Sequence, residues 1–170
     1  MFTRNYYNWQ EFYQKNFDKL GSTYSSIASI GVVNLSGIAF DVQVWQGNNI
    51  QQKLQNASYL MNVEIRLGTG NTAATTSDYN LENDITSSLN MSTYVAGNAS
   101  NDGIHVVFTI GGTNTTSSDV VIKEIGFIKN FYISTNTNTT PSLFNRTVLD
   151  TPETIEAGEN FSFVYELILR

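Results

Sequence analysis

Hydrophobic and polar residues follow two different periods along the chain, and the change comes near residue 21. From Trp9 to Leu20 the apolar positions recur every three or four residues, which is the spacing of one helical face. Gly21 follows as a stop signal. The pattern predicts an amphipathic helix over residues 8–20, and its apolar stripe consists of Trp9, Phe12, Tyr13, Phe17 and Leu20.

Beyond the Gly/Ser-rich stretch 21–26 the period becomes two, as in half-buried strands. Alternation is clear in segments 38–45, 61–68 and 161–169. Weaker strand patterns fall at 30–35, 93–96, 104–110, 120–128 and 142–149. The expected connections are polar loops at 68–77, 97–103, 111–118 and 134–142. Because no long helical pattern separates the strands, we expect an all-β fold: an antiparallel β-sandwich or jelly-roll-like domain with an N-terminal amphipathic helix.

The change of period divides the chain into two expected parts. Residues 1–30 would form the aromatic helix and its hinge, and residues 31–170 would form the β-sandwich domain. A helix of this length is marginal alone in water, so its apolar stripe must be buried against something. Two alternatives are open: the stripe covers the end of its own sandwich, or it docks into a groove of a neighbouring protein. In the second case residues 1–30 are an anchoring segment.

Composition excludes several classes of partner. Asn, Ser and Thr make up 55 of the 170 residues, whereas only 14% are charged. The net charge is −6, so the chain lacks the basic residues that neutralise phosphates, and we do not expect a nucleic-acid partner. We also expect no membrane partner, since no apolar run has the length of a transmembrane helix.

The residues that carry enzyme or metal chemistry are sparse. His105 is the only histidine and there is no cysteine, so a catalytic triad or a thiolate metal site is not indicated. The acidic segment 78–84 lacks the spacing of a calcium loop, and a helix-capping turn is the preferred interpretation. Asp41 and Glu64 could form a glycosidase-type carboxylate pair, but they occupy ordinary solvent-facing strand positions. We therefore expect no cofactor, no metal and no enzyme activity.

Two charged residues interrupt otherwise apolar strands. Glu124 lies in segment 120–128, and Arg146 lies in segment 142–149. A charge inside an apolar strand is costly unless it is paired. We predict that Glu124 and Arg146 form a structural ion pair.

Two stretches of the chain together resemble structural proteins of tailed bacteriophages. The first is a strand that enters a Gly-Thr-Gly loop, followed by small residues and an Asp-x-x-Leu-Glu turn, at 66–70, 72–77 and 78–82. The second is an Ile-x-Glu-Ile-Gly-Phe strand, followed by Arg-Thr-Val-Leu-Asp-x-Pro and an Ala-Gly-Glu turn, at 122–127, 146–152 and 157–159. The order of these pieces is the distinctive feature.

This resemblance implies a β-rich module located in the virion. Such a module is a non-enzymatic building block, often a homo-oligomer, and its partners are other virion proteins of the capsid, portal or tail. In that setting the aromatic stripe would be the partner-docking surface. An alternative is a receptor- or glycan-binding module of a fibre or tail tip, with Tyr94 and the loops at 97–103 and 134–142 as contacts.

Overall fold

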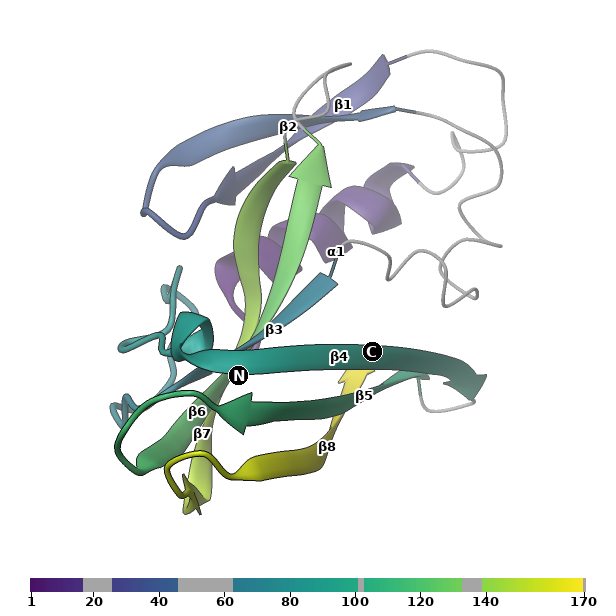
Figure 1. The fold of residues 1–170 in the computed structure, drawn as a ribbon. Coiled ribbons are helices and arrows are strands. Elements are labelled where there is room, and N and C mark those ends of the chain that lie inside the picture. The colour runs from purple at the N-terminus through teal and green to yellow at the C-terminus, as the bar shows by residue number, and fades with distance from the viewer. Residues whose placement is uncertain (17–25, 46–62, 101–102, 133–138, 170) are drawn as a thin grey trace.

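The computed structural model describes residues 1–16, 26–45, 63–100, 103–132 and 139–169 (Figure 1). One α-helix, α1 (Arg4–Asn16), precedes all the strands. The strands are β1 (Ser26–Val33), β2 (Ala39–Trp45), β3 (Val63–Gly68), β4 (Leu89–Ser100), β5 (Gly103–Asn114), β6 (Val120–Tyr132), β7 (Thr139–Ile155) and β8 (Asn160–Leu169). A short 3₁₀ helix, η3 (Thr86–Ser88), lies just before β4.

The expectation of an all-β fold is confirmed, and each expected strand segment overlaps a strand of the structure. Strands extend into three of the four expected loops. Residues 97–100 continue β4, residues 111–114 continue β5 and residues 139–142 belong to β7. The Asn, Gly and Thr residues there resemble turn sequences, but pairing with neighbouring strands extends the ladders through them.

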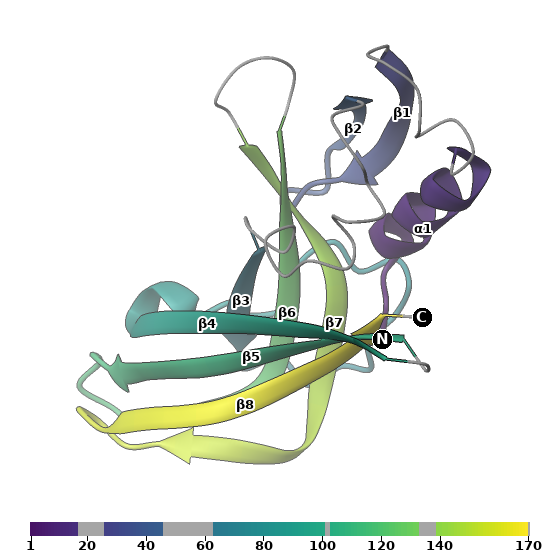
Figure 2. The ribbon, with the colours of Figure 1, turned by 90° about the vertical axis from the view of Figure 1, so that its right-hand side faces the viewer.

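The strands form three antiparallel sheets. β1 pairs with β2, β6 lies between β3 and β7, and β5 lies between β4 and β8. The strands of the two three-stranded sheets cross at a large angle (Figures 1 and 2). Residues 1–3 extend the β6-centred sheet, because Phe2 bridges Asn145 of β7 and the backbone N–H of Thr3 donates to Phe144 O at 2.9 Å.

The core lies where the two three-stranded sheets face each other. Phe108 of β5 and Phe127 of β6 are buried with ring centroids 5.5 Å apart, and the ring of Phe127 also contacts Phe144 of β7. Ile65 of β3 and Ile110 of β5 belong to the same cluster. Both sheets therefore depend on one set of buried side chains.

Helix α1 begins four residues earlier than the sequence pattern predicts, at Arg4 rather than at residue 8. Its first turn is buried through Asn5 and Tyr6, and the ring of Tyr6 stacks on Phe2 with centroids 4.0 Å apart. The pattern missed this turn because Asn5 is polar. The expected boundary at residue 30 falls inside β1, so the start of the chain and the strands share a core.

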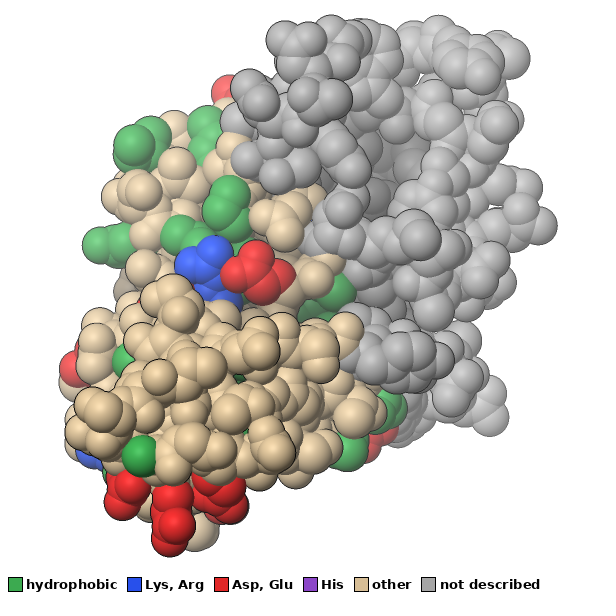
Figure 3. Space-filling view, viewed as in Figure 1, with side chains coloured by type: hydrophobic (Ala, Val, Ile, Leu, Met, Phe, Trp, Pro, Cys, Tyr) green, Lys and Arg blue, Asp and Glu red, His purple; other side chains and the backbone are tan. Residues whose placement is uncertain are grey.

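Neutral polar residues dominate the described part of the face shown in Figure 3. On the face shown in Figure 3 most of the coloured surface is tan, the colour of neutral polar side chains and backbone, and Asp and Glu side chains gather at its lower end. This matches the low charged fraction of the chain.

Candidate functional site

Four charged side chains meet on the face of the β6-centred sheet that is covered by segment 68–84. The Nε of Arg146 donates to Glu124 Oε2 at 2.7 Å, and both side chains are buried. The same guanidinium contacts Asp78 Oδ2 at 2.9 Å and Glu82 Oε2 at 3.4 Å. The predicted pair is thus present, and the structure adds Asp78 and Glu82 to it. We call these four residues the Arg146 cluster.

Glu124 also holds the backbone of the covering segment. Its Oε1 accepts the N–H of Gly70 at 3.0 Å and of Asn83 at 2.9 Å, and its Oε2 accepts the N–H of Glu82 at 3.2 Å. A Cβ on Gly68 would clash with Glu124 and with the carbonyl of Asn83. Glycine is therefore required where the segment leaves β3, and one buried carboxylate ties its beginning to its end.

The contacts of the Arg146 cluster stabilise its ionised form. Burial alone would lower the pKa of Arg146, but hydrogen bonds and charges from Glu124 and Asp78 outweigh it and raise that pKa above its usual value. Burial would raise the pKa of Asp78, yet hydrogen bonds from Thr75 and from Arg146 bring that pKa below its usual value. Both charges therefore persist at neutral pH.

Segment 78–84 does not form the expected helical turn, because its polar groups bind outside the segment. Glu82 accepts from the backbone N–H and the hydroxyl of Thr72, at 3.0 and 2.9 Å, and these bonds lower the pKa of Glu82. Leu81 is buried over Gly126 of β6, where a Cβ would lie 2.9 Å from Leu81 Cδ2. The segment is pinned by side-chain contacts instead of helical hydrogen bonds.

The Arg146 cluster therefore functions as a structural clip. Its three carboxylates accept hydrogen bonds from the segment that covers them and from Arg146. Most of the sequence pieces that carry the bacteriophage resemblance contribute to this clip or adjoin it, namely 66–70, 72–77, 78–82, 122–127 and 146–152. The order of these pieces in the sequence corresponds to one packed arrangement in space.

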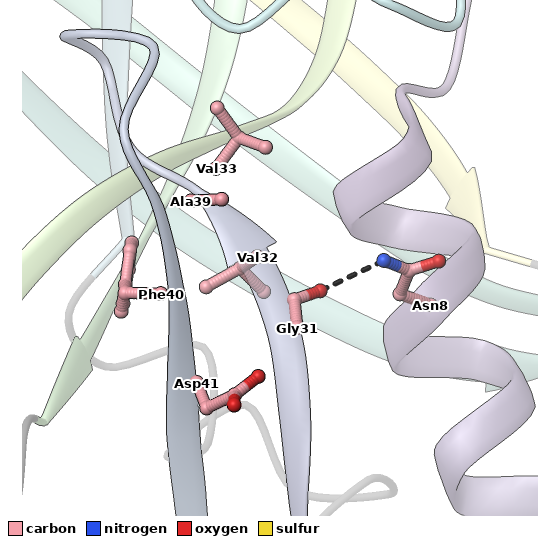
Figure 4. A pocket seen from close by; sticks show the side chains of 7 residues that line it. All are labelled: Asn8, Gly31, Val32, Val33, Ala39, Phe40 and Asp41. Carbon is pink, nitrogen blue, oxygen red and sulfur yellow. Dashed lines mark hydrogen bonds between the residues drawn. The ribbon is translucent and has the colours of Figure 1, made fainter.

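A pocket of about 350 Å³ lies between α1 and the β1–β2 hairpin (Figure 4). Asn8 Nδ2 donates to Gly31 O at 2.7 Å across it. Apolar side chains and one carboxylate, Asp41, complete the lining, which consists of Asn8, Gly31, Val32, Val33, Ala39, Phe40 and Asp41. Glu64, the other carboxylate of the glycosidase alternative, instead pairs with Arg66 on β3.

Asn5 and Asn8 of α1 bind the outer backbone edge of β1. Asn5 Oδ1 accepts the N–H of Val33 at 2.7 Å, and its Nδ2 donates to Val33 O at 2.8 Å. The bond from Asn8 to Gly31 O lies two residues along the same edge. Two asparagine side chains thus replace part of a neighbouring strand, a role that the sequence pattern did not reveal.

The predicted docking stripe lies mostly beyond what the structure describes. Trp9, Phe12 and Tyr13 belong to α1, but their side chains are outside the described part, and Phe17 and Leu20 lie outside the described residues. The same holds for several other residues discussed in the sequence analysis. The described part of the structure does not include the side chains of Tyr94 in β4 and His105 in β5, nor the loop residues 101–102 and 133–138.

Neither the protein-family models, nor the curated proteins, nor the solved structures contain a match to this chain. Within the described part of the chain, no group of three or more His, Cys, Asp or Glu side chains is placed to hold a metal ion. No helix in that part has the length and apolar character needed to cross a membrane.

Proposed function

We propose that this chain is a non-enzymatic structural component of a tailed-bacteriophage virion. In this proposal it is a β-sandwich or jelly-roll-like building block that contacts neighbouring capsid, portal or tail proteins. The observation that carries the proposal is the Arg146 cluster, because it unites the segments that resemble phage structural proteins and directs their charges to internal contacts. A sandwich is favoured by the single core shared between the two three-stranded sheets.

The surface composition supports a role in assembly. A charge buried at an interface needs a partner there, and interface cores are depleted of charged residues. Only 14% of the residues are charged, and the face in Figure 3 is largely neutral. Burying amides and hydroxyls that find hydrogen-bond partners costs less than burying charged groups, so such a surface suits contacts with several neighbours.

The purified virion tests this proposal. In density-gradient fractions of the phage that encodes the chain, quantitative mass spectrometry should find it at a fixed copy number per particle. Antibodies against the chain should label the particles in electron micrographs. A host protein of similar abundance, measured in the same fractions, controls for carry-over. Recovery of the chain in the soluble lysate alone would contradict the proposal.

We further propose that the aromatic stripe of the N-terminal segment contacts the neighbouring protein. Deletion of residues 1–20 would be a poor test, since it removes the buried residues Thr3, Asn5 and Tyr6. Substitution Phe17→Ser should instead reduce incorporation into particles. Tyr7→Ser is the matched control, because Tyr7 is exposed and lies outside the stripe. Equal incorporation of both folded variants would exclude this contact.

A further inference from the structure

Several strand edges are covered by other parts of the same chain. β7 pairs with residues 1–3, and the outer edge of β1 receives the side chains of Asn5 and Asn8. The end of β3 is covered by residues 83–85, through hydrogen bonds to residues 67 and 69. An open strand edge readily recruits a further strand, so covering it limits unwanted pairing.

In the described part of the chain, no comparable segment or side chain covers the outer backbone edge of strand β8. There its one strand neighbour is β5, and the two are paired over ten consecutive positions without a register shift. Its ten residues include no Pro, no Gly and one charged residue, Glu166. Proline, bulges and closely spaced charges are the usual devices that block an edge. β8 is therefore a regular strand that is suited to pairing.

The two faces of β8 are also incompletely covered. On the core side, Tyr165 and Phe163 are half-buried, whereas Phe108 and Ile110, their partners on the central strand β5, are fully buried. On the outer side, Val164 is 65% exposed. A further strand beside β8 would bury apolar area on both faces, which is favourable.

We propose that β8 pairs in antiparallel fashion with β8 of a second copy across a twofold axis, which joins the two sheets into one of six strands. With the axis at Val164, Phe163 lies opposite the partner's Tyr165, and Ser162 lies opposite the partner's Glu166. Directly opposed side chains in such pairs are in contact. This register puts apolar residues together on the core side and places no like charges opposite each other, so β8 is complementary to itself.

The bacteriophage resemblance implies a homo-oligomer, and this interface specifies which surface forms it and with which symmetry. It is tested on the isolated chain, whereas the virion proposal is tested on particles, so the two can fail independently. Native mass spectrometry and light scattering should give twice the chain mass of 18.9 kDa at high concentration, with dissociation on dilution.

Two lysine variants distinguish the edge of the sheet from its outer face. Val164→Lys brings two positive charges together at the axis and should convert the dimer to monomer. Thr109→Lys is the control: Thr109 is exposed and pairs with Val164, but it lies on the central strand β5. It should remain dimeric. Circular dichroism should show that both variants are folded, since both side chains point to solvent.

Cysteine cross-linking tests the register. The chain has no cysteine, so one substitution introduces a single thiol. Val164→Cys should form a disulfide-linked dimer under mild oxidation, because directly opposed residues have Cα distances within the disulfide range. Thr109→Cys should not, since the two thiols would be about 14 Å apart, three strand spacings. A monomer at all concentrations, equal cross-linking of both variants, or an open-ended assembly through β4 would overturn the proposal.

Discussion

At the scale of single residues, Arg146 and Glu124 are expected to contribute strongly to stability. Each is buried, and each makes contacts that only the other residues of the Arg146 cluster and the covering segment supply. A buried ion pair adds little compared with a well-packed apolar pair, but the loss of one partner leaves an uncompensated charge. Substitution of one member should therefore cost much more than loss of a surface pair.

The first prediction concerns Glu124→Gln. It retains the shape but removes the negative charge nearest to Arg146, and we expect the free energy of unfolding to fall by about 3–5 kcal/mol in urea titrations. Glu64→Gln is the control, because the Glu64–Arg66 pair is partly exposed and its loss should cost about 0–1 kcal/mol. A coupling energy near zero between Glu124 and Arg146 in a double-mutant cycle would contradict the role of the pair.

The second prediction concerns Lys129, whose pKa burial lowers from 10.5 to about 8. Between these two pH values the unfolded chain binds the proton more tightly, so the free energy of unfolding should rise as the pH increases from about 8 to 10.5. Lys129→Met should flatten that rise.

Urea titrations at a series of pH values measure this effect. Lys123→Met is the control, as Lys123 lies on the same strand, β6. An unchanged slope above pH 8 in the Lys129 variant would show that this amine does not titrate as stated.

At the scale of elements, the N-terminal residues complete structures formed by distant strands. Residues 1–3 extend the sheet beside β7, and α1 uses Asn5 and Asn8 to bind the edge of β1. Asn5 Nδ2 also donates to Leu143 O of β7 at 3.1 Å. The start of α1 therefore joins the small β1–β2 sheet to the larger sheet.

The third prediction follows from this link. Asn5→Ala leaves the N–H and carbonyl of Val33 without the bonds that Asn5 supplies, and it should destabilise the protein by about 2–4 kcal/mol. Hydrogen exchange should show faster exchange at the Val33 amide. Asn8→Ala removes one more exposed bond and should cost about 1 kcal/mol or less. Similar losses for both variants would argue against the special role of Asn5.

At the scale of the whole molecule, the two three-stranded sheets depend on one core. Phe108 is fully buried between them, and its ring faces Phe127 of the other sheet and Tyr165 of its own. The sheets should therefore unfold together.

The fourth prediction tests this shared core. Phe108→Ala should lower the free energy of unfolding by about 3–5 kcal/mol. Amide protection should decrease in both β5 and β6, because both strands lose the same packing partner. Thr109→Ala, at an exposed site on β5, should change stability by less than about 0.5 kcal/mol. Loss of protection confined to one sheet would show that the sheets are independent.

The sequence could predict the features that depend on neighbours along the chain. Alternation located the strands, and the cost of a buried charge predicted that Glu124 and Arg146 would pair. The start of α1 was misplaced because Asn5, a polar residue, is buried through bonds to β1 and β7. The turn expected at 78–84 was also wrong. Local capping signals carry no information about Glu124, whose carboxylate accepts the backbone N–H groups of Glu82 and Asn83.

By itself, then, the sequence determined the all-β class, the strand segments and the requirement for a buried counter-charge. These follow from side-chain period and from the solvation energy of single groups, which are local properties. Only the tertiary structure decided which strands share a sheet and which residues complete the Arg146 cluster. Asp78 lies 68 positions before Arg146, and Asn5 lies 138 positions before Leu143. No local pattern specifies contacts over such separations, because they form only when the sheets pack around a common core.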